Sequence, residues 1–72
     1  MEIQFDLIGK IIEGDHKGWY VKFIDDFENS GGYYIMEAPD IKFKDGFDSW
    51  LESKEQVIGY CLESNWTIKY LD

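Results

Sequence analysis

The chain has 72 residues and includes three Trp, five Tyr and five Phe, while 15 acidic residues against seven lysines give a net charge of −8. The length allows one domain, residues 1–72, and so many aromatic side chains cannot all fit inside its core. The charge disfavours direct binding to nucleic acid or to an anionic membrane, because phosphate contacts need cations, and it favours a basic protein partner. Solubility alone is the plainer interpretation of an acidic surface.

A single cysteine, Cys61, cannot form an internal disulfide bond, whereas a secreted domain of this size usually carries several. The first residues are acidic and lack the apolar segment of a signal peptide. No apolar stretch approaches the roughly 20 residues that a membrane span needs. We therefore expect a cytoplasmic protein.

Two strands are predicted in the first third of the chain. Residues 3–7 alternate between apolar and polar side chains, which is the period of a strand, and Gly9 interrupts the pattern. A loop bounded by glycines follows at 14–18, and the β-branched and aromatic residues 19–24 are typical of a strand. Together these segments predict a hairpin.

A third strand and a short fourth are expected in the middle of the chain. Residues 25–32 form an acidic and then glycine-rich loop, residues 33–37 form a strand, and Pro39 ends it. Residues 41–46 are a loop. Residues 47–52 fit either a short strand or a first helical turn, and we favour the strand.

A helix and a final strand are predicted at the end. Ser53 and Gln56 match the capping box that begins a helix, and residues 66–70 alternate as a strand does. The order β-β-β-(β)-α-β predicts an α+β domain, a small antiparallel sheet with one helix packed on a face. The helix should cover the sheet with an apolar stripe, in which the thiol is a buried apolar group; the stripe consists of Val57, Ile58, Cys61 and Leu62.

One oxygen-rich segment matches the spacing of a calcium loop. The matching residues are Asp26, Glu28, Ser30, Gly31 and Glu37. The flanking segments predict strands rather than the two helices of an EF-hand, and acids are frequent enough in this chain for chance matches. We therefore predict no metal and no cofactor.

Residues that could support catalysis are scarce. His16 lies beside Asp15 in the glycine-bounded loop, with no second His or Cys for a zinc site and no indicated nucleophile. The chain contains no glycine-rich phosphate loop and no Gly-x-Ser-x-Gly elbow. We expect His16 to be a surface residue and the protein not to be an enzyme.

What remains is a surface on which carboxylates border aromatic side chains. Such a surface suits a partner rich in Lys or Arg, because the aromatics act as anchors and the acids match the partner's charge. The alternative is that Phe47 and Trp50 belong to the core and that the acids are simply solvated. The predicted partner-binding residues are Asp25, Asp26, Glu28, Tyr33, Tyr34, Asp45, Asp48 and Trp50.

Three segments resemble small bacterial immunity-type proteins of polymorphic toxin systems. They are residues 31–35 (Gly-Gly-Tyr-Tyr-Ile), 46–52 (Gly-Phe-Asp-Ser-Trp-Leu-Glu) and 65–70 (Asn-Trp-Thr-Ile-Lys-Tyr). The resemblance covers the last two-thirds of the chain and rests on glycine turns and aromatic anchors. It implies a cytoplasmic protein that binds and blocks a toxin domain, and it assigns no contact residue.

Three functions stay open at this point. The first is an inhibitor of a basic protein, most simply an immunity-type protein that neutralises a toxin domain. The second is a phage-type anti-defence protein whose carboxylates replace phosphates in a nucleic-acid-processing enzyme. The third is a structural module that forms a homodimer through exposed aromatics.

Overall fold

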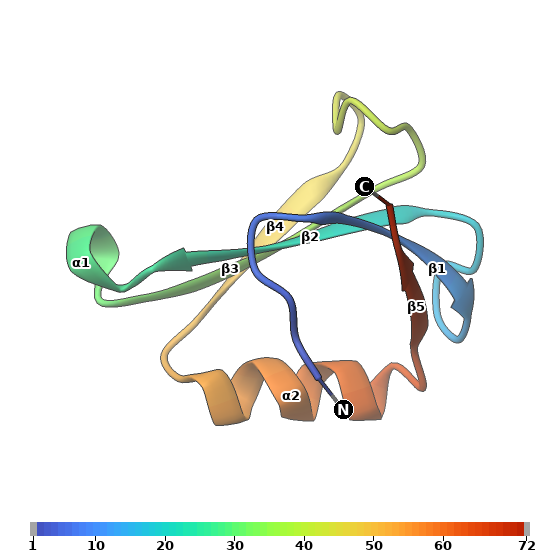
Figure 1. Cartoon of the computed structure of the whole chain (residues 1–72). Coiled ribbons are helices and arrows are strands. Elements are labelled where there is room, and N and C mark those ends of the chain that lie inside the picture. The colour runs from blue at the N-terminus through green and yellow to red at the C-terminus, as the bar shows by residue number, and fades with distance from the viewer. Residues whose placement is uncertain (1, 72) are drawn as a thin grey trace.

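The computed structural model describes residues 2–71, and its order of elements agrees with the predicted α+β class (Figure 1). The elements are β1 (Ile8–Glu13), β2 (Tyr20–Asp26), α1 (Phe27–Ser30), β3 (Gly32–Ala38), β4 (Phe47–Leu51), α2 (Lys54–Glu63) and β5 (Thr67–Tyr70).

The strands form one antiparallel sheet of five, in the order β4-β3-β2-β1-β5. From β1 to β4 each strand pairs with the next one along the chain. After α2 the chain returns to the far side of the sheet, where β5 pairs with β1. The strands β4 and β5 are therefore the two edges of the sheet.

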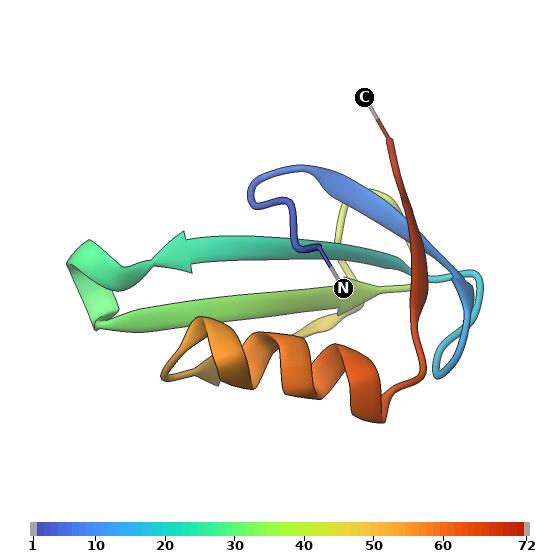
Figure 2. The same cartoon turned by 60° about the horizontal axis from the view of Figure 1, so that its bottom comes forward.

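The helix α2 lies along one face of the sheet, as Figures 1 and 2 show from two directions. Successive strand residues point to opposite faces, so Val21, Phe23 and Ile35 all point toward α2 and are fully buried. Val57 and Cys61 face them from the helix. Each such side chain stabilises the fold by about 1.5–3 kcal/mol when it is fully buried.

The predicted start of α2 is confirmed. Ser53 is the N-cap residue, and its Oγ accepts a hydrogen bond of 3.2 Å from the backbone N–H of Gln56. The reciprocal half of the capping box is displaced by one residue, because Oε1 of Gln56 accepts from the backbone N–H of Glu52 at 2.8 Å. The first contact satisfies a donor that the first helical turn would leave free, and the second fixes the residue before the N-cap against the helix.

The predicted apolar stripe of the helix is wrong at Leu62, whose side chain is 61% exposed. A helix turns by about 100° per residue, so Tyr60 and Cys61 flank Val57 on the sheet side while Leu62 turns past it. Tyr60 is half-buried and packs against the core in the place that Leu62 was expected to fill.

The first strand lies later in the chain than predicted. Residues 3–7 contribute a single bridge, between Phe5 and Phe23, and the strand itself is β1. Gly9 does not interrupt this strand but lies buried inside it. A Cβ atom at Gly9 would lie 2.5 Å from Cγ2 of Ile68, so the missing side chain lets β5 pack closely on β1.

The loop predicted at 25–32 contains the short helix α1. It ends at Gly31, which has a left-handed backbone (φ 80°) and donates its N–H to the carbonyl of Phe27 at 3.0 Å. Between residues 2 and 71, no helix has both the length and the apolar character needed to cross a membrane.

Candidate functional site

The sheet face opposite α2 carries the residues of greatest functional interest. We call it the open face; the connection between β3 and β4 rises on this side of the sheet (Figure 1). Tyr34 is paired with Ile24 on β2 and with Trp50 on β4, so the three side chains form a row across the open face. Asp48 pairs with Met36 in the next row. The open face thus joins aromatic groups to a carboxylate at the β4 edge.

Trp50 is held in a fixed orientation although 46% of it is exposed. Its Nε1–H donates to Oγ of Ser30 at 2.9 Å, and the same hydroxyl donates to the carbonyl oxygen of Asp26 at 3.2 Å. The short helix α1 is therefore what places Ser30 against the indole. An anchor that is already ordered loses less side-chain entropy when a partner binds.

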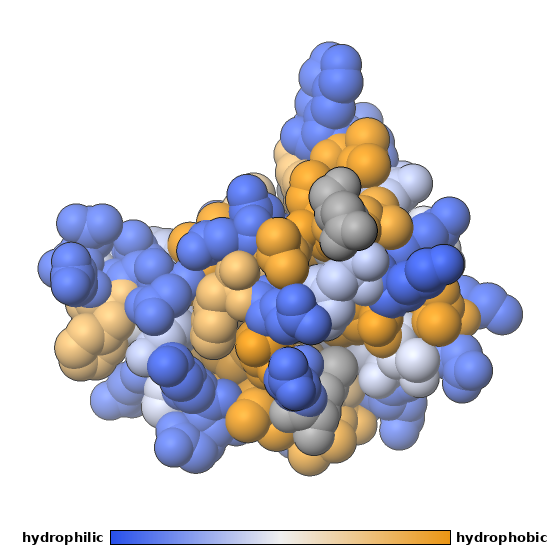
Figure 3. Space-filling model, in the orientation of Figure 1, coloured by the Kyte–Doolittle hydropathy of each residue, from blue (hydrophilic) through white to orange (hydrophobic). Residues whose placement is uncertain are grey.

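The carboxylates at the α1 end of the molecule border a concavity of about 430 Å³. Oδ1 of Asp25 accepts from the backbone N–H of Phe27 at 3.1 Å, and Oδ1 of Asp26 accepts from Nδ2 of Asn29 at 3.1 Å. Glu28 lies on the exposed surface of α1. In Figure 3 this end of the molecule, at the left, is mostly hydrophilic, whereas apolar side chains gather nearer the centre.

Among residues 2–71 the charged side chains form almost no ion pairs. Over residues 2–71, the sole ion pair within 4.0 Å joins His16 to Glu37, and no lysine takes part. Among the strand residues of the open face, the lysines lie on β1, β2 and β5, where Lys10 pairs with Lys69 and Lys22 with Ile8, whereas Asp26 lies at the end of β2 beside α1 and Asp48 lies on β4. The connection before β4 carries both signs of charge, because Lys42 and Lys44 lie there with Asp40 and Asp45.

The structure brings part of the predicted site together. Tyr34, Asp48 and Trp50 share the open face, and Asp26 adjoins them through Ser30. Asp25 and Glu28 border the neighbouring concavity. Since Phe47 and Trp50 are 47% and 46% exposed, the alternative that they are core residues is not supported.

Two predicted site residues do not join Trp50 on the open face. Tyr33 lines the concavity at the α1 end, but it points to the α2 side and is 8% exposed, with its ring 5.7 Å from that of Phe5, so it cannot serve as an exposed anchor. Asp45 lies in the connection before β4, where its backbone N–H donates to Oδ1 of Asp40 at 3.2 Å. Hydrogen bonds from backbone N–H groups, above all that of Lys44, hold the pKa of Asp40 below its usual value.

The calcium pattern does not come together as a site. Asp26 pairs with Gly32 at one end of β3, whereas Glu37 pairs with Val21 near the other end. The two carboxylates are separated by five strand residues, or about 17 Å. Within residues 2–71 the structure contains no group of three or more His, Cys, Asp or Glu side chains placed to hold a metal ion.

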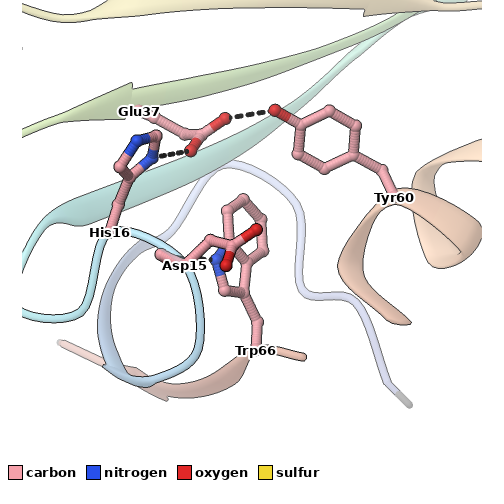
Figure 4. A network of polar contacts seen from close by, with 5 residues as sticks. All are labelled: Asp15, His16, Glu37, Tyr60 and Trp66. Atoms are coloured by element: carbon pink, nitrogen blue, oxygen red, sulfur yellow. Dashed lines mark hydrogen bonds and ion pairs between the residues drawn. The ribbon is translucent and has the colours of Figure 1, made fainter. Parts of the chain in front are cut away.

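Glu37 forms a buried polar network that the sequence did not reveal (Figure 4). Its side chain is 1% exposed. Nδ1 of His16 lies 3.0 Å from Oε1, and the hydroxyl of Tyr60 donates to Oε2 at 2.6 Å. The network links the loop 14–18, β3 and α2, and it satisfies a carboxylate that would be costly to bury alone.

His16 lies at the surface, as predicted, but it also takes part in the network. Its side chain is 42% exposed, but its ring stacks on that of Trp19 at 4.3 Å and contacts a buried acid. The loop is fixed from a second side, because Nε1–H of Trp66 donates to the carbonyl oxygen of Asp15 at 2.7 Å. Both contacts cross long stretches of sequence, so neither had a local signal.

Two groups beside the network resist ionisation. Burial, followed by the hydrogen bond to Glu37 and its negative charge, raises the pKa of Tyr60 to about 12. Burial raises the pKa of the Cys61 thiol to about 12 as well, again with a contribution from the charge of Glu37. The burial predicted for Cys61 is confirmed, and its thiol is in the protonated, unreactive form at neutral pH.

Comparisons with known proteins found no matching family model, no matching curated protein and no matching solved structure.

Proposed function

We propose that this protein is a non-enzymatic binding protein that inhibits a basic protein partner, most simply an immunity-type protein that neutralises a toxin domain. One observation carries the proposal: an ordered, half-exposed Trp50 lies beside Tyr34 and Asp48 on a sheet face that α2 leaves uncovered. Aromatic anchors of this kind dominate the binding energy of protein interfaces.

The charges indicate which partner such an anchor serves. The carboxylates near Trp50 have no lysine within ion-pairing distance, and the chain as a whole carries a charge of −8. A basic surface would be attracted to the β4 and α1 end of the molecule and repelled from the lysines near β5. Binding there would block a basic cleft, such as one that holds phosphate groups in a nuclease.

The test compares wild-type protein with the variants Trp50→Ala and Asp48→Asn as baits in source-cell lysate, at low and at moderate salt. Lys69→Gln is the matched control, because it changes a charge at the far edge of the sheet. We expect wild type and the control to retain one stoichiometric basic protein that salt releases, and the other two variants to retain much less. Inhibition of the purified partner then completes the test.

The identity and behaviour of the retained protein decide the outcome. A toxin domain supports the immunity-type function, whereas a nucleic-acid-processing defence enzyme supports the phage-type alternative. Retention that is equal for Trp50→Ala and insensitive to salt would contradict the proposal, because surface charges make association depend on ionic strength.

A further inference from the structure

The two edges of the sheet differ in their protection against further pairing. The β5 edge has four residues, contains Lys69 and pairs with β1 across a register shift between Ile11 and Glu13. Short strands, edge lysines and bulges are the devices by which proteins prevent strand addition. The β5 edge therefore uses three of them.

The β4 edge has neither a lysine nor a register shift and is one residue longer than β5, and its one charged residue is Asp48. Its five residues pair with β3 without any shift, from Phe47 opposite Glu37 to Leu51 opposite Tyr33. No lysine, proline or glycine occurs within β4. The outer backbone N–H and C=O groups of a regular edge strand form a template for one more strand.

A groove lies where the side chains of an added strand would point. Its volume is about 490 Å³, and it runs between the end of β4 and the outer side of α2; its lining is Leu51, Gln56, Gly59, Tyr60 and Glu63. A strand added to β4 would lie about 4.8 Å away, with alternate side chains on the α2 side of the sheet. Those side chains would enter the groove. A Cβ atom built on Gly59 meets nothing within 4 Å, so the helix leaves room there.

The two faces of this edge call for different side chains. On the open face, Asp48 and Trp50 offer a carboxylate and an exposed indole, both of which attract a Lys or Arg cation. On the α2 side, Leu51 and Tyr60 offer mainly apolar surface. An added strand would thus alternate basic residues with apolar ones. A second copy of this chain is disfavoured, because pairing β4 with a second β4 would bring two edges of the same negative charge together, each with Asp45, Asp48 and Glu52 in or beside the strand.

We propose that β4 accepts an extended segment of another protein, with basic and apolar residues in alternation, as a sixth strand of the sheet. This inference rests on the proposed function and specifies how the basic partner is held: main-chain hydrogen bonds supply the pairing, and Asp48, Trp50 and the groove select the side chains.

The test uses a synthetic peptide of about eight residues, a usual strand length, in which Lys and Val alternate. Two further peptides carry N-methyl groups on alternate residues, the first on the odd-numbered residues and the second on the even-numbered ones. Each peptide thereby loses the N–H donors along one of its two edges, while its charge is unchanged. Binding is followed by the amide signals of isotope-labelled protein. We expect saturable changes centred on β4, slower hydrogen exchange of its outer amides, and loss of at least about tenfold in affinity for one methylated peptide.

Protein variants provide a second, independent measurement. Gly59→Leu fills the groove and should weaken peptide binding by about tenfold, whereas the matched control Gly59→Ala should bind as wild type does. Unchanged amide spectra away from α2 confirm that both variants fold.

The outcomes separate this inference from the proposed function. Equal binding of all three peptides would show attraction by charge alone and would overturn strand addition, while leaving a basic partner possible. No binding of the parent peptide would also overturn it. Concentration-dependent changes at β4 without peptide would overturn it in favour of a second copy. The proposed function itself fails in the capture experiment alone, when no basic protein is retained or when retention is equal for Trp50→Ala and insensitive to salt.

Discussion

Removing one hydroxyl group, by Tyr60→Phe, should destabilise the fold far more than its size suggests. The hydroxyl donates to Oε2 of Glu37 at 2.6 Å, and the side chain of Glu37 is 1% exposed, so water cannot easily replace the lost donor. Hydrogen bonds to charged groups contribute about 1.5–3 kcal/mol. The ring itself is kept, including its contact with Trp66 at 5.5 Å between centroids.

The measurement is urea unfolding followed by tryptophan fluorescence, together with thermal unfolding. A loss of about 2 kcal/mol lowers Tm by roughly 8–16 °C in a domain of this size. Tyr34→Phe is the matched control, since within residues 2–71 the hydroxyl of Tyr34 makes no hydrogen bond, and it should stay within about 0.5 kcal/mol of wild type.

A double-mutant cycle identifies the cause of the loss. In a Glu37→Gln background the buried charge is gone, so Tyr60→Phe should cost about 1 kcal/mol less than it does alone. If Tyr60→Phe were as stable as wild type, or if its cost were the same in both backgrounds, the account of Glu37 as a buried acid that depends on this donor would be refuted.

Three other predictions concern stability and reactivity. In the folded protein the pKa values of Tyr60 and Cys61 are both raised to about 12, from 10.0 and 9.0, so the unfolded chain releases these protons at lower pH. The free energy of unfolding should therefore fall as pH rises from about 9 to 12, and Tyr60→Phe or Cys61→Ala should flatten that fall in urea titrations. A free energy of unfolding that does not change over this pH range in wild type would contradict the prediction. Gly59→Ala should raise the free energy of unfolding by about 0.5–1 kcal/mol, because Gly59 lies in a helix with open space around it. Gly14→Ala should lower the free energy of unfolding by more than about 1 kcal/mol, because φ of Gly14 is 101° and a Cβ there would lie 2.5 Å from two carbonyl oxygens. Equal effects of the two substitutions would be inconsistent with these backbone conformations. The Cys61 thiol should react with a disulfide reagent at the rate of unfolding, and rapid labelling of native protein would show that it is accessible.

Local signals in the sequence predicted most of the fold. The start of α2 depends on Ser53 and on residues within one helical turn of it, so a capping pattern was enough to place it. The strand predicted at 33–37 is β3, Gly32–Ala38, because its apolar and aromatic residues continue up to Pro39. Local patterns failed at Gly9, whose role depends on Ile68, a residue far along the chain.

The candidate site was predicted less completely, for the same reason. Trp50 and Tyr34 were named from their residue type, but their juxtaposition follows from the register between β3 and β4, which a sequence does not fix. Neighbouring residues of β3 point to opposite faces of the sheet, which explains why Tyr33 is buried while Tyr34 is not. The Glu37 network unites residues 16, 37 and 60, and no local pattern connects these three positions.

The pairing of β1 with β5 has a mechanical consequence. The two strands are antiparallel, so Gly9 near the start of β1 lies opposite Tyr70 at the end of β5. Force applied by pulling the two ends of the described chain apart reaches the β1–β5 ladder at this end, where the backbone N–H of Leu71 also donates to the carbonyl of Ile8 at 2.7 Å, and the hydrogen bonds open one after another instead of sharing the load. Although its core is well packed, the sheet should therefore unzip at low force from these ends, while a pull that loads β2 against β3 lengthwise should meet much higher resistance.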